Sequence, residues 1–169
     1  MSTAKVITLH DVFKTEEPKS YLGSKVSELK KAVEIDEAPS FPRVIMVELS
    51  NICNHRCTFC AITSMQRAKN YIDPEVFRRI VAEAHDLGAR EVSLVGGAEP
   101  LANKKLEEYI KFCSDLGFEY IYFTTNATLA DEQRWKRLID AGLHSIKISI
   151  NGGTPESYAR IHGQNQCQP

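Results

Sequence analysis

From Arg43 onward, short apolar runs alternate with segments whose apolar residues recur at helical spacing. Short apolar runs bounded by turn residues are typical of buried strands, and an i, i+3, i+4 recurrence is typical of amphipathic helices. The apolar runs predict strands over residues Val44–Leu49, Val92–Val95, Tyr120–Thr125 and Ser145–Ile150. The pattern therefore predicts a chain in which strands and helices alternate.

The segment after the first predicted strand carries clear helix signals. Asp73 is suited to cap a helix, Pro74 to begin it and Gly88 to end it. Apolar residues repeat at helical period between them and predict a buried stripe. The stripe comprises Val76, Phe77, Ile80, Val81, Ala84 and Leu87.

The segment after the second predicted strand also has the pattern of a helix. Asn103 is expected to cap it and Gly117 to end it. Its apolar stripe comprises Leu106, Ile110, Cys113 and Leu116.

Two more helices are expected farther along the chain. Thr128 and Asp131 form a weak capping box before a helix that places Trp135 in the core. Thr154-Pro155-Glu156 opens another helix, which we expect to be cut short near Gly163.

Alternation of strands and helices predicts an α/β fold with a parallel sheet. The sheet could be an open doubly wound sheet or part of a (βα) barrel. In the last predicted strand, isoleucines at 146, 148 and 150 face one way, and Ser145, Lys147 and Ser149 face the other. A polar row suits a barrel lumen that holds a polar ligand, so the pattern favours a partial barrel.

The 169 residues suggest one main domain. We expect an N-terminal extension over residues 1–40, with a short helix near 24–34, a core over 41–163 and a tail over 164–169. Lysine and arginine number 21 and aspartate and glutamate 22, so the net charge of −1 argues against a nucleic-acid partner. The sequence shows no apolar run long enough for a membrane span and no secretory signal, so we expect a cytoplasmic protein without a membrane partner.

Three of the five cysteines, Cys53, Cys57 and Cys60, fall within eight residues directly after the first predicted strand. An odd, clustered set is a poor disulfide framework and is more typical of metal ligands. Three thiolates can hold three irons of a cubane iron–sulfur cluster and leave the fourth iron open to another ligand.

The alternative is a zinc site in a non-catalytic scaffold, with His55, Cys113 or Cys167 as fourth ligand. His55 is crowded between two of the cysteines, and Cys113 lies on an apolar stripe where burial is expected. The other histidines, including His162, show no pattern and are expected to be structural or surface residues. Glu48 either faces the lumen or lies at a solvated strand end.

Four motifs together resemble the radical S-adenosylmethionine (SAM) family. They are Cys53-x3-Cys57-x2-Cys60 with Phe59 before the last cysteine, Gly96-Gly97-Ala98-Glu99-Pro100, Thr124-Thr125-Asn126 and Ser149-Ile150-Asn151-Gly152-Gly153. Each follows a predicted strand, in order, over about residues 43–163. Taken alone, Gly96-Gly97 could be an ordinary turn and Asn126 an Asx turn.

The resemblance implies a 4Fe–4S cluster on Cys53, Cys57 and Cys60, with SAM chelated to the open iron. It implies that Phe59 lies near the adenine and that Gly96, Gly97, Ala98 and Glu99 offer backbone groups to the methionine ammonium. Ser149 and Asn151 would lie near the ribose and carboxylate, and Asn126 near the substrate. A flavodoxin or ferredoxin type of electron donor is also implied.

Family members typically have six βα units, whereas four strands are predicted here. We therefore expect a truncated or split barrel, whose last strand presents an unpaired edge with poorly covered isoleucines. Such a chain should bind SAM weakly unless a second copy or a complementing chain supplies the missing strands.

Overall fold

A sheet of four parallel strands, in the order β1-β2-β3-β4, forms the centre of the fold. The computed structural model describes residues 41–163, so the helix predicted near 24–34 and Cys167 lie outside the described residues. The strands are β1 Val44–Met46, β2 Glu91–Ser93, β3 Tyr120–Thr125 and β4 Ser145–Ile148. The predicted parallel α/β class is confirmed.

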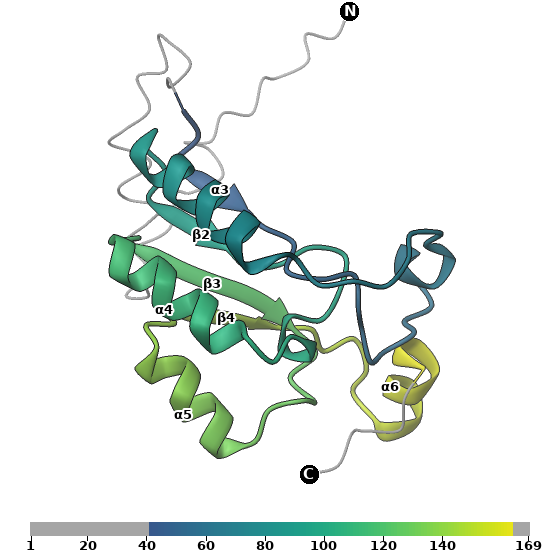
Figure 1. Cartoon of the computed structure of the whole chain (residues 1–169). Coiled ribbons are helices and arrows are strands. Elements are labelled where there is room, and N and C mark those ends of the chain that lie inside the picture. The colour runs from purple at the N-terminus through teal and green to yellow at the C-terminus, as the bar shows by residue number, and fades with distance from the viewer. Residues whose placement is uncertain (1–40, 164–169) are drawn as a thin grey trace, which may run out of the picture. The chain divides into compact units, whose positions relative to one another are not determined.

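A helix separates each strand from the next, and a fourth helix follows β4. The helices are α3 Pro74–Asp86, α4 Leu106–Leu116, α5 Glu132–Asp140 and α6 Pro155–His162, and two short 3-10 helices are η1 Ala61–Ser64 and η2 Pro100–Ala102. Figure 1 shows α3, α4 and α5 along one face of the sheet, whereas α6 lies beyond the ends to which the strand arrows point. No helix among residues 41–163 is long and apolar enough to cross a bilayer.

Helix α3 begins as its sequence predicts. The Asp73 carboxylate accepts hydrogen bonds from the backbone N–H groups of Glu75 and Val76, at 2.9 and 3.1 Å. The buried face is narrower than the predicted stripe: it consists of Phe77, Val81 and Ala84. The remaining stripe residues, Val76, Ile80 and Leu87, are exposed because they lie on the flanks of the helix rather than against the sheet.

Two predicted helix caps are wrong. Asn103 does not cap α4: Lys105 occupies the cap position, and the Asn103 side chain accepts from the Lys105 N–H at 2.9 Å in a turn between η2 and α4. The predicted box of Thr128 and Asp131 is replaced by a single cap, because the Asp131 carboxylate itself accepts from the Arg134 N–H at 2.7 Å.

The sequence predicts that α6 is cut short near Gly163, but the helix has a cap at each end. A capping box joins Thr154 to Ser157 at its start. It ends at Gly163, whose φ of 65° is left-handed and whose N–H donates to the Ala159 carbonyl. A glycine suits this end because a Cβ atom there would lie 2.9 Å from the Arg56 carbonyl oxygen.

Three of the four strands differ in length from the prediction. β1 ends at Met46 rather than Leu49, β4 at Ile148 rather than Ile150, and β2 runs over Glu91–Ser93 rather than 92–95. β1 and β2 share only three paired positions, and the loops that follow each strand begin directly after the last pair. β3 has the predicted bounds.

The core lies between the sheet and α3, α4 and α5. Its largest fully buried side chains include Phe77, Phe123, Leu94, Leu101, Leu106, Ile110, Ile121 and Leu138. Cys113 is fully buried among them, as predicted, whereas Trp135 is only partly buried and packs against the core.

In the described sheet β4 pairs with β3 alone. Ile146 packs against the core, but Ile148 and Ile150 are 50% and 69% exposed. The poorly covered isoleucine face expected here is therefore found at Ile148 and Ile150 but not at Ile146.

Candidate functional site

The loops that follow the four strands meet at one edge of the sheet, because the carboxyl ends of parallel strands share an edge. The cysteine loop follows β1, Gly96–Glu99 follow β2, Asn126 follows β3, and Ser149 and Asn151 follow β4. Figure 1 shows this edge facing α6 and η1. Every residue predicted for the site thus lies on the same side of the fold.

The cysteine loop carries three free, partly buried thiols, those of Cys53, Cys57 and Cys60. Its backbone is bonded to the end of α6. The Arg56 N–H donates to the His162 carbonyl at 3.2 Å, and the Thr58 N–H donates to the Ile161 carbonyl at 2.9 Å. The last described helix therefore holds the loop in place.

The environment of the loop favours neutral thiols while no cation is bound. Burial raises the pKa of Cys53, and the neighbouring Cys57 and Cys60 thiolates raise it further. Burial, followed by the charge of Cys60, likewise raises the pKa of Cys57. Several thiolates repel one another here, so a bound cation would relieve the repulsion and release their protons.

His162 was expected to be a structural or surface residue, but it lies at the cysteine loop. Its Nδ1 atom is 3.2 Å from the Cys57 Sγ atom. The ring is 1% exposed and stacks on Tyr158, with centroids 4.1 Å apart. Burial lowers the pKa of His162, so its neutral form is favoured. Sequence spacing could not reveal this contact, because only the path of α6 brings the residue back to the loop.

His55 is also buried at this point. One ligand atom each from His55, Cys57 and His162 lie within 4.8 Å of one another. The crowding expected from the position of His55 between two cysteines does not keep its ring away from Cys57.

The Gly96-Gly97 turn is built around Glu48. The Gly97 N–H donates to the Glu48 carboxylate at 3.0 Å, and Arg67 donates to the other oxygen at 2.8 Å. The hydrogen bond from Gly97 is the main cause that lowers the pKa of Glu48. A Cβ atom at Gly96 would lie 2.5 Å from the Glu48 Cγ atom, so this close approach requires glycine. Glu48 is thus a partner of this turn.

Glu99 joins the loop after β2 to the end of β3. Its buried carboxylate accepts from the Leu101 N–H, from the Thr125 hydroxyl at 2.6 Å and from the Asn126 N–H at 2.8 Å. Its own N–H donates to the Ile52 carbonyl at 3.1 Å, next to the first cysteine. Glu99 therefore fixes the relative position of three site loops.

Asn126 adopts the Asx turn that its sequence allowed. Its side-chain oxygen accepts from the Thr128 N–H at 3.0 Å. Its amide also donates to the Asn54 side chain at 3.0 Å, and Asn54 donates to the Thr128 hydroxyl at 2.9 Å. This network connects the end of β3 to the cysteine loop.

The remaining predicted residues are more open. Phe59 is 66% exposed, with its ring edge-on to His162 at a centroid distance of 6.2 Å. Ala98 and Ser149 are partly buried, and Asn151 is exposed. The Ser149 N–H donates to the Thr125 carbonyl at 2.8 Å, which holds this segment beside β3.

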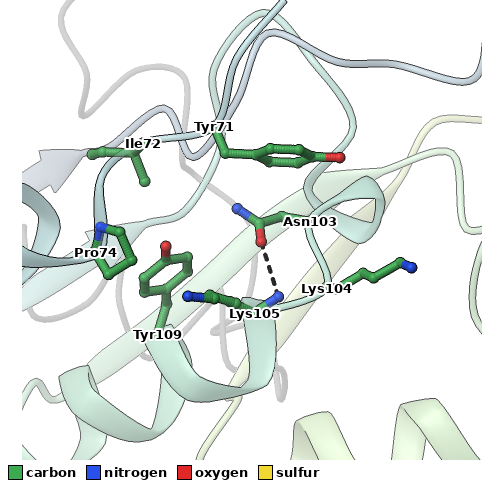
Figure 2. Close-up of a pocket in the computed structure, with 7 residues that line it drawn as sticks. All are labelled: Tyr71, Ile72, Pro74, Asn103, Lys104, Lys105 and Tyr109. Atoms are coloured by element: carbon green, nitrogen blue, oxygen red, sulfur yellow. Dashed lines mark hydrogen bonds between the residues drawn. The ribbon is translucent and has the colours of Figure 1, made fainter.

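A separate pocket of about 500 Å³ lies between the starts of α3 and α4. It is lined by Tyr71, Ile72, Pro74, Asn103, Lys104, Lys105 and Tyr109. Figure 2 shows these side chains and the hydrogen bond that the Asn103 side chain accepts from the Lys105 backbone N–H. None of the predicted site residues lines this pocket.

The geometry agrees with a family comparison. A model of the Radical SAM superfamily matches residues 47–167, which is most of the chain. The chain belongs to the radical SAM superfamily. The resemblance drawn from the four sequence motifs is therefore confirmed.

Curated radical SAM relatives support this membership. The chain is 36% identical over 123 residues to a PqqA peptide cyclase of Rhizobium meliloti, covering 72% of this chain and 32% of that protein. It is 35% identical over 120 residues to a probable GTP 3′,8-cyclase of Thermococcus kodakarensis, covering 70% of this chain and 38% of that protein. The chain spans about a third of the length of the curated relatives that it matches.

Solved structures confirm the partial-barrel fold. Streptococcus suis SuiB bound to S-adenosylmethionine matches with a TM-score of 0.64 at 24% identity, over 84% of this chain and 32% of that chain. BtrN in complex with AdoMet and 2-DOIA matches with a TM-score of 0.58 at 20% identity, over 78% of this chain and 55% of that chain. Both are similar in fold to the described radical SAM core.

Proposed function

We propose that this chain binds a 4Fe–4S cluster and SAM, as the cofactor-binding core of a radical SAM enzyme. The observation that carries the proposal is the position of the three-thiol loop. It lies at the carboxyl edge of a parallel sheet, and the loops after β2, β3 and β4 are bonded to it or to one another there.

The donor set fits such a cluster. Cys53, Cys57 and Cys60 supply three thiols on one loop, within eight residues of the sequence. Cys113 is the other cysteine among the described residues, and it is buried on α4, where it contributes to the core. Three protein thiolates would leave one iron of such a cluster for the amino and carboxylate groups of SAM.

The neighbouring loops suit a nucleotide cofactor. We propose that backbone groups of Gly96–Glu99 receive the methionine ammonium and that Ser149 and Asn151 approach the ribose and carboxylate. Phe59, which is largely exposed beside the cysteine loop, is available to the adenine. Gly153 leaves open space, because a Cβ atom there would have no neighbour within 4 Å. Asn126 is assigned to the substrate side.

When bound, the reduced cluster supplies the electron that cleaves SAM to methionine and a 5′-deoxyadenosyl radical, which abstracts a substrate hydrogen. The protein's contribution is to hold and orient. Glu99 fixes three of the loops, and the Asn54, Asn126 and Thr128 network ties the cysteine loop to β3. We propose a low-potential donor of the flavodoxin or ferredoxin type as the electron source.

Anaerobic reconstitution tests the proposal. The wild-type chain should bind about four irons and show the visible absorbance of a 4Fe–4S cluster. The Cys57→Ala variant should lose that cluster, whereas Cys113→Ala, a matched control outside the site, should retain it. With dithionite and SAM, the reconstituted chain should form 5′-deoxyadenosine. Equal iron content in wild type and Cys57→Ala would refute the assignment.

A further inference from the structure

A second set of metal ligands overlaps the cysteine loop without using two of its thiols. His55, Cys57 and His162 each place a ligand atom within 4.8 Å of the others. Two imidazoles and one thiolate are a donor set that Zn²⁺ accepts readily. We propose that the cluster-free chain binds one Zn²⁺ ion through His55, Cys57 and His162.

The distances are close to those of a tetrahedral site. With Zn–S near 2.3 Å and Zn–N near 2.0–2.1 Å, a sulfur and a nitrogen ligand lie about 3.5 Å apart. The Cys57 Sγ atom and the His162 Nδ1 atom are already 3.2 Å apart. No two ligand atoms of the set are more than 4.8 Å apart, so the widest separation exceeds the tetrahedral value by at most about 1.3 Å, which side-chain rotations can remove.

The burial of His162 supports a ligand role. The ring is 1% exposed, and its Nε2 atom has no hydrogen-bond partner among the described residues. A zinc ion bound at Nδ1 would leave Nε2 as it is, so the support for a ligand role comes from the Nδ1 atom, which lies 3.2 Å from the Cys57 Sγ atom. The polar contact that the ring does make is with a thiol, which is itself a metal ligand.

The site is held from two directions. The Cys57 side is fixed by backbone bonds from Arg56 and Thr58 to the end of α6, the helix that carries His162. On the other side, the His55 Nε2 atom lies 3.3 Å from the Thr128 hydroxyl. Such a partner orients a ligating imidazole. Three protein ligands leave one tetrahedral position for water.

Zinc bound here and the iron–sulfur cluster exclude each other, because both need the Cys57 thiolate. This consequence rests on the proposed function, whereas zinc binding itself does not. The chain would therefore exist in two metal states, and zinc would slow the assembly of the cluster.

The test uses metal-free chain under anaerobic conditions, with Zn²⁺ measured by chelator competition and Co²⁺ as a spectroscopic substitute. The decisive variant is Cys53→Ser/Cys60→Ser, which lacks two cluster ligands but keeps the proposed zinc ligands. We expect it to bind one Zn²⁺ per chain and to give the sulfur-to-cobalt charge-transfer band and visible bands of a tetrahedral site.

Two further variants test whether His162 is a zinc ligand. His162→Phe and the more conservative His162→Gln should weaken zinc binding at least about tenfold in that background. Circular dichroism establishes that each variant is folded. Loss of zinc in Cys53→Ser/Cys60→Ser would mean that the three thiolates bind the ion and would overturn the proposal. Unchanged affinity in both folded His162 variants would overturn it as well. Failure of cluster reconstitution, by contrast, would count against the proposed function alone.

Discussion

The His162 Nδ1 atom lies 3.2 Å from the Cys57 Sγ atom, although 105 positions separate the two residues. The contact exists because α6 turns back beyond the carboxyl edge of the sheet and ends against the cysteine loop (Figure 1). The geometry of the cysteine loop thus depends on the end of the last described helix.

Replacement of Gly163 by alanine should loosen the cysteine loop. The position has a φ of 65°, and an added Cβ atom would lie 2.9 Å from the Arg56 carbonyl. We expect a loss of about 1–3 kcal/mol in the free energy of unfolding, together with lower iron content after reconstitution. Chemical denaturation and iron analysis measure the two effects.

Gly88→Ala is the matched control for Gly163→Ala. Gly88 also has a positive φ, of 118°, but no atom lies within 4 Å of the added Cβ position. This variant should lose stability from backbone strain and keep the iron content of the wild type. Equal iron content in both variants would show that the approach to Arg56 does not shape the loop.

The turn at Gly96 should be coupled to Glu48. Alanine at Gly96 would place its Cβ atom 2.5 Å from the Glu48 Cγ atom and should destabilise the fold by about 1–3 kcal/mol. Glu48→Gly removes the obstructing Cβ, Cγ and Oε2 atoms of Glu48, which lie 2.5–2.6 Å from the added Cβ position. A double-mutant cycle of Gly96→Ala and Glu48→Gly should therefore give a coupling energy of about 1 kcal/mol or more. Additive effects would contradict the contact, and Gly153→Ala, which meets no neighbour, serves as the control.

Acid should abolish the contribution of the Glu48 carboxylate. The hydrogen bond from Gly97 is the main cause that lowers its pKa below the ordinary 4.5. A carboxylate whose pKa is lowered on folding stabilises the protein above its unfolded-state pKa, and this contribution disappears as the pH falls through the folded-state pKa. At neutral pH the free energy of unfolding of the wild type should exceed that of Glu48→Gln by about 1 kcal/mol or less, because the carboxylate is partly exposed.

That difference should shrink as the pH is lowered below 4.5, and denaturation curves over this range measure it. A difference that stays constant to the lowest pH would show that the carboxylate charge does not act here.

The cysteines should differ in reactivity. Burial raises the pKa of Cys113 to about 12, so at pH 8 about one in ten thousand of its side chains is a thiolate. Iodoacetamide should modify Cys53, Cys57 and Cys60 in the folded, metal-free chain and modify Cys113 only after denaturation. Peptide mass spectrometry gives the labelling of each site. Comparable labelling of Cys113 in the folded chain would contradict its burial.

Much of the fold could be predicted because its signals are local. The apolar runs located all four strands, and β3 has the predicted bounds. The end of β1 was predicted less accurately, because the apolar run continues past Met46, where the paired ladder stops. The Val47 N–H still donates to the Ser93 carbonyl. The predicted cap of α4 was wrong because the Asn103 side chain forms an Asx turn two residues before the actual cap position, Lys105.

The site could be predicted as far as its residues lie in motifs. Cys53, Cys57 and Cys60 form one loop, and parallel topology brings the other motifs to the same edge. His162 and Glu48 could not be assigned, because their roles depend on contacts with Cys57 and Gly97 that no local spacing encodes.

The bonds from Arg56 and Thr58 to the end of α6 also set an order of events during biosynthesis. Their acceptor carbonyls, on His162 and Ile161, are made about 100 residues after the loop. At about 5–20 residues per second, the ribosome needs about 5–20 seconds to reach them. Until then the thiols have no α6 to hold them, so the loop acquires its final shape only after α6 leaves the exit tunnel. Iron delivery to this chain is accordingly expected to follow translation of α6 rather than accompany the emergence of the cysteines.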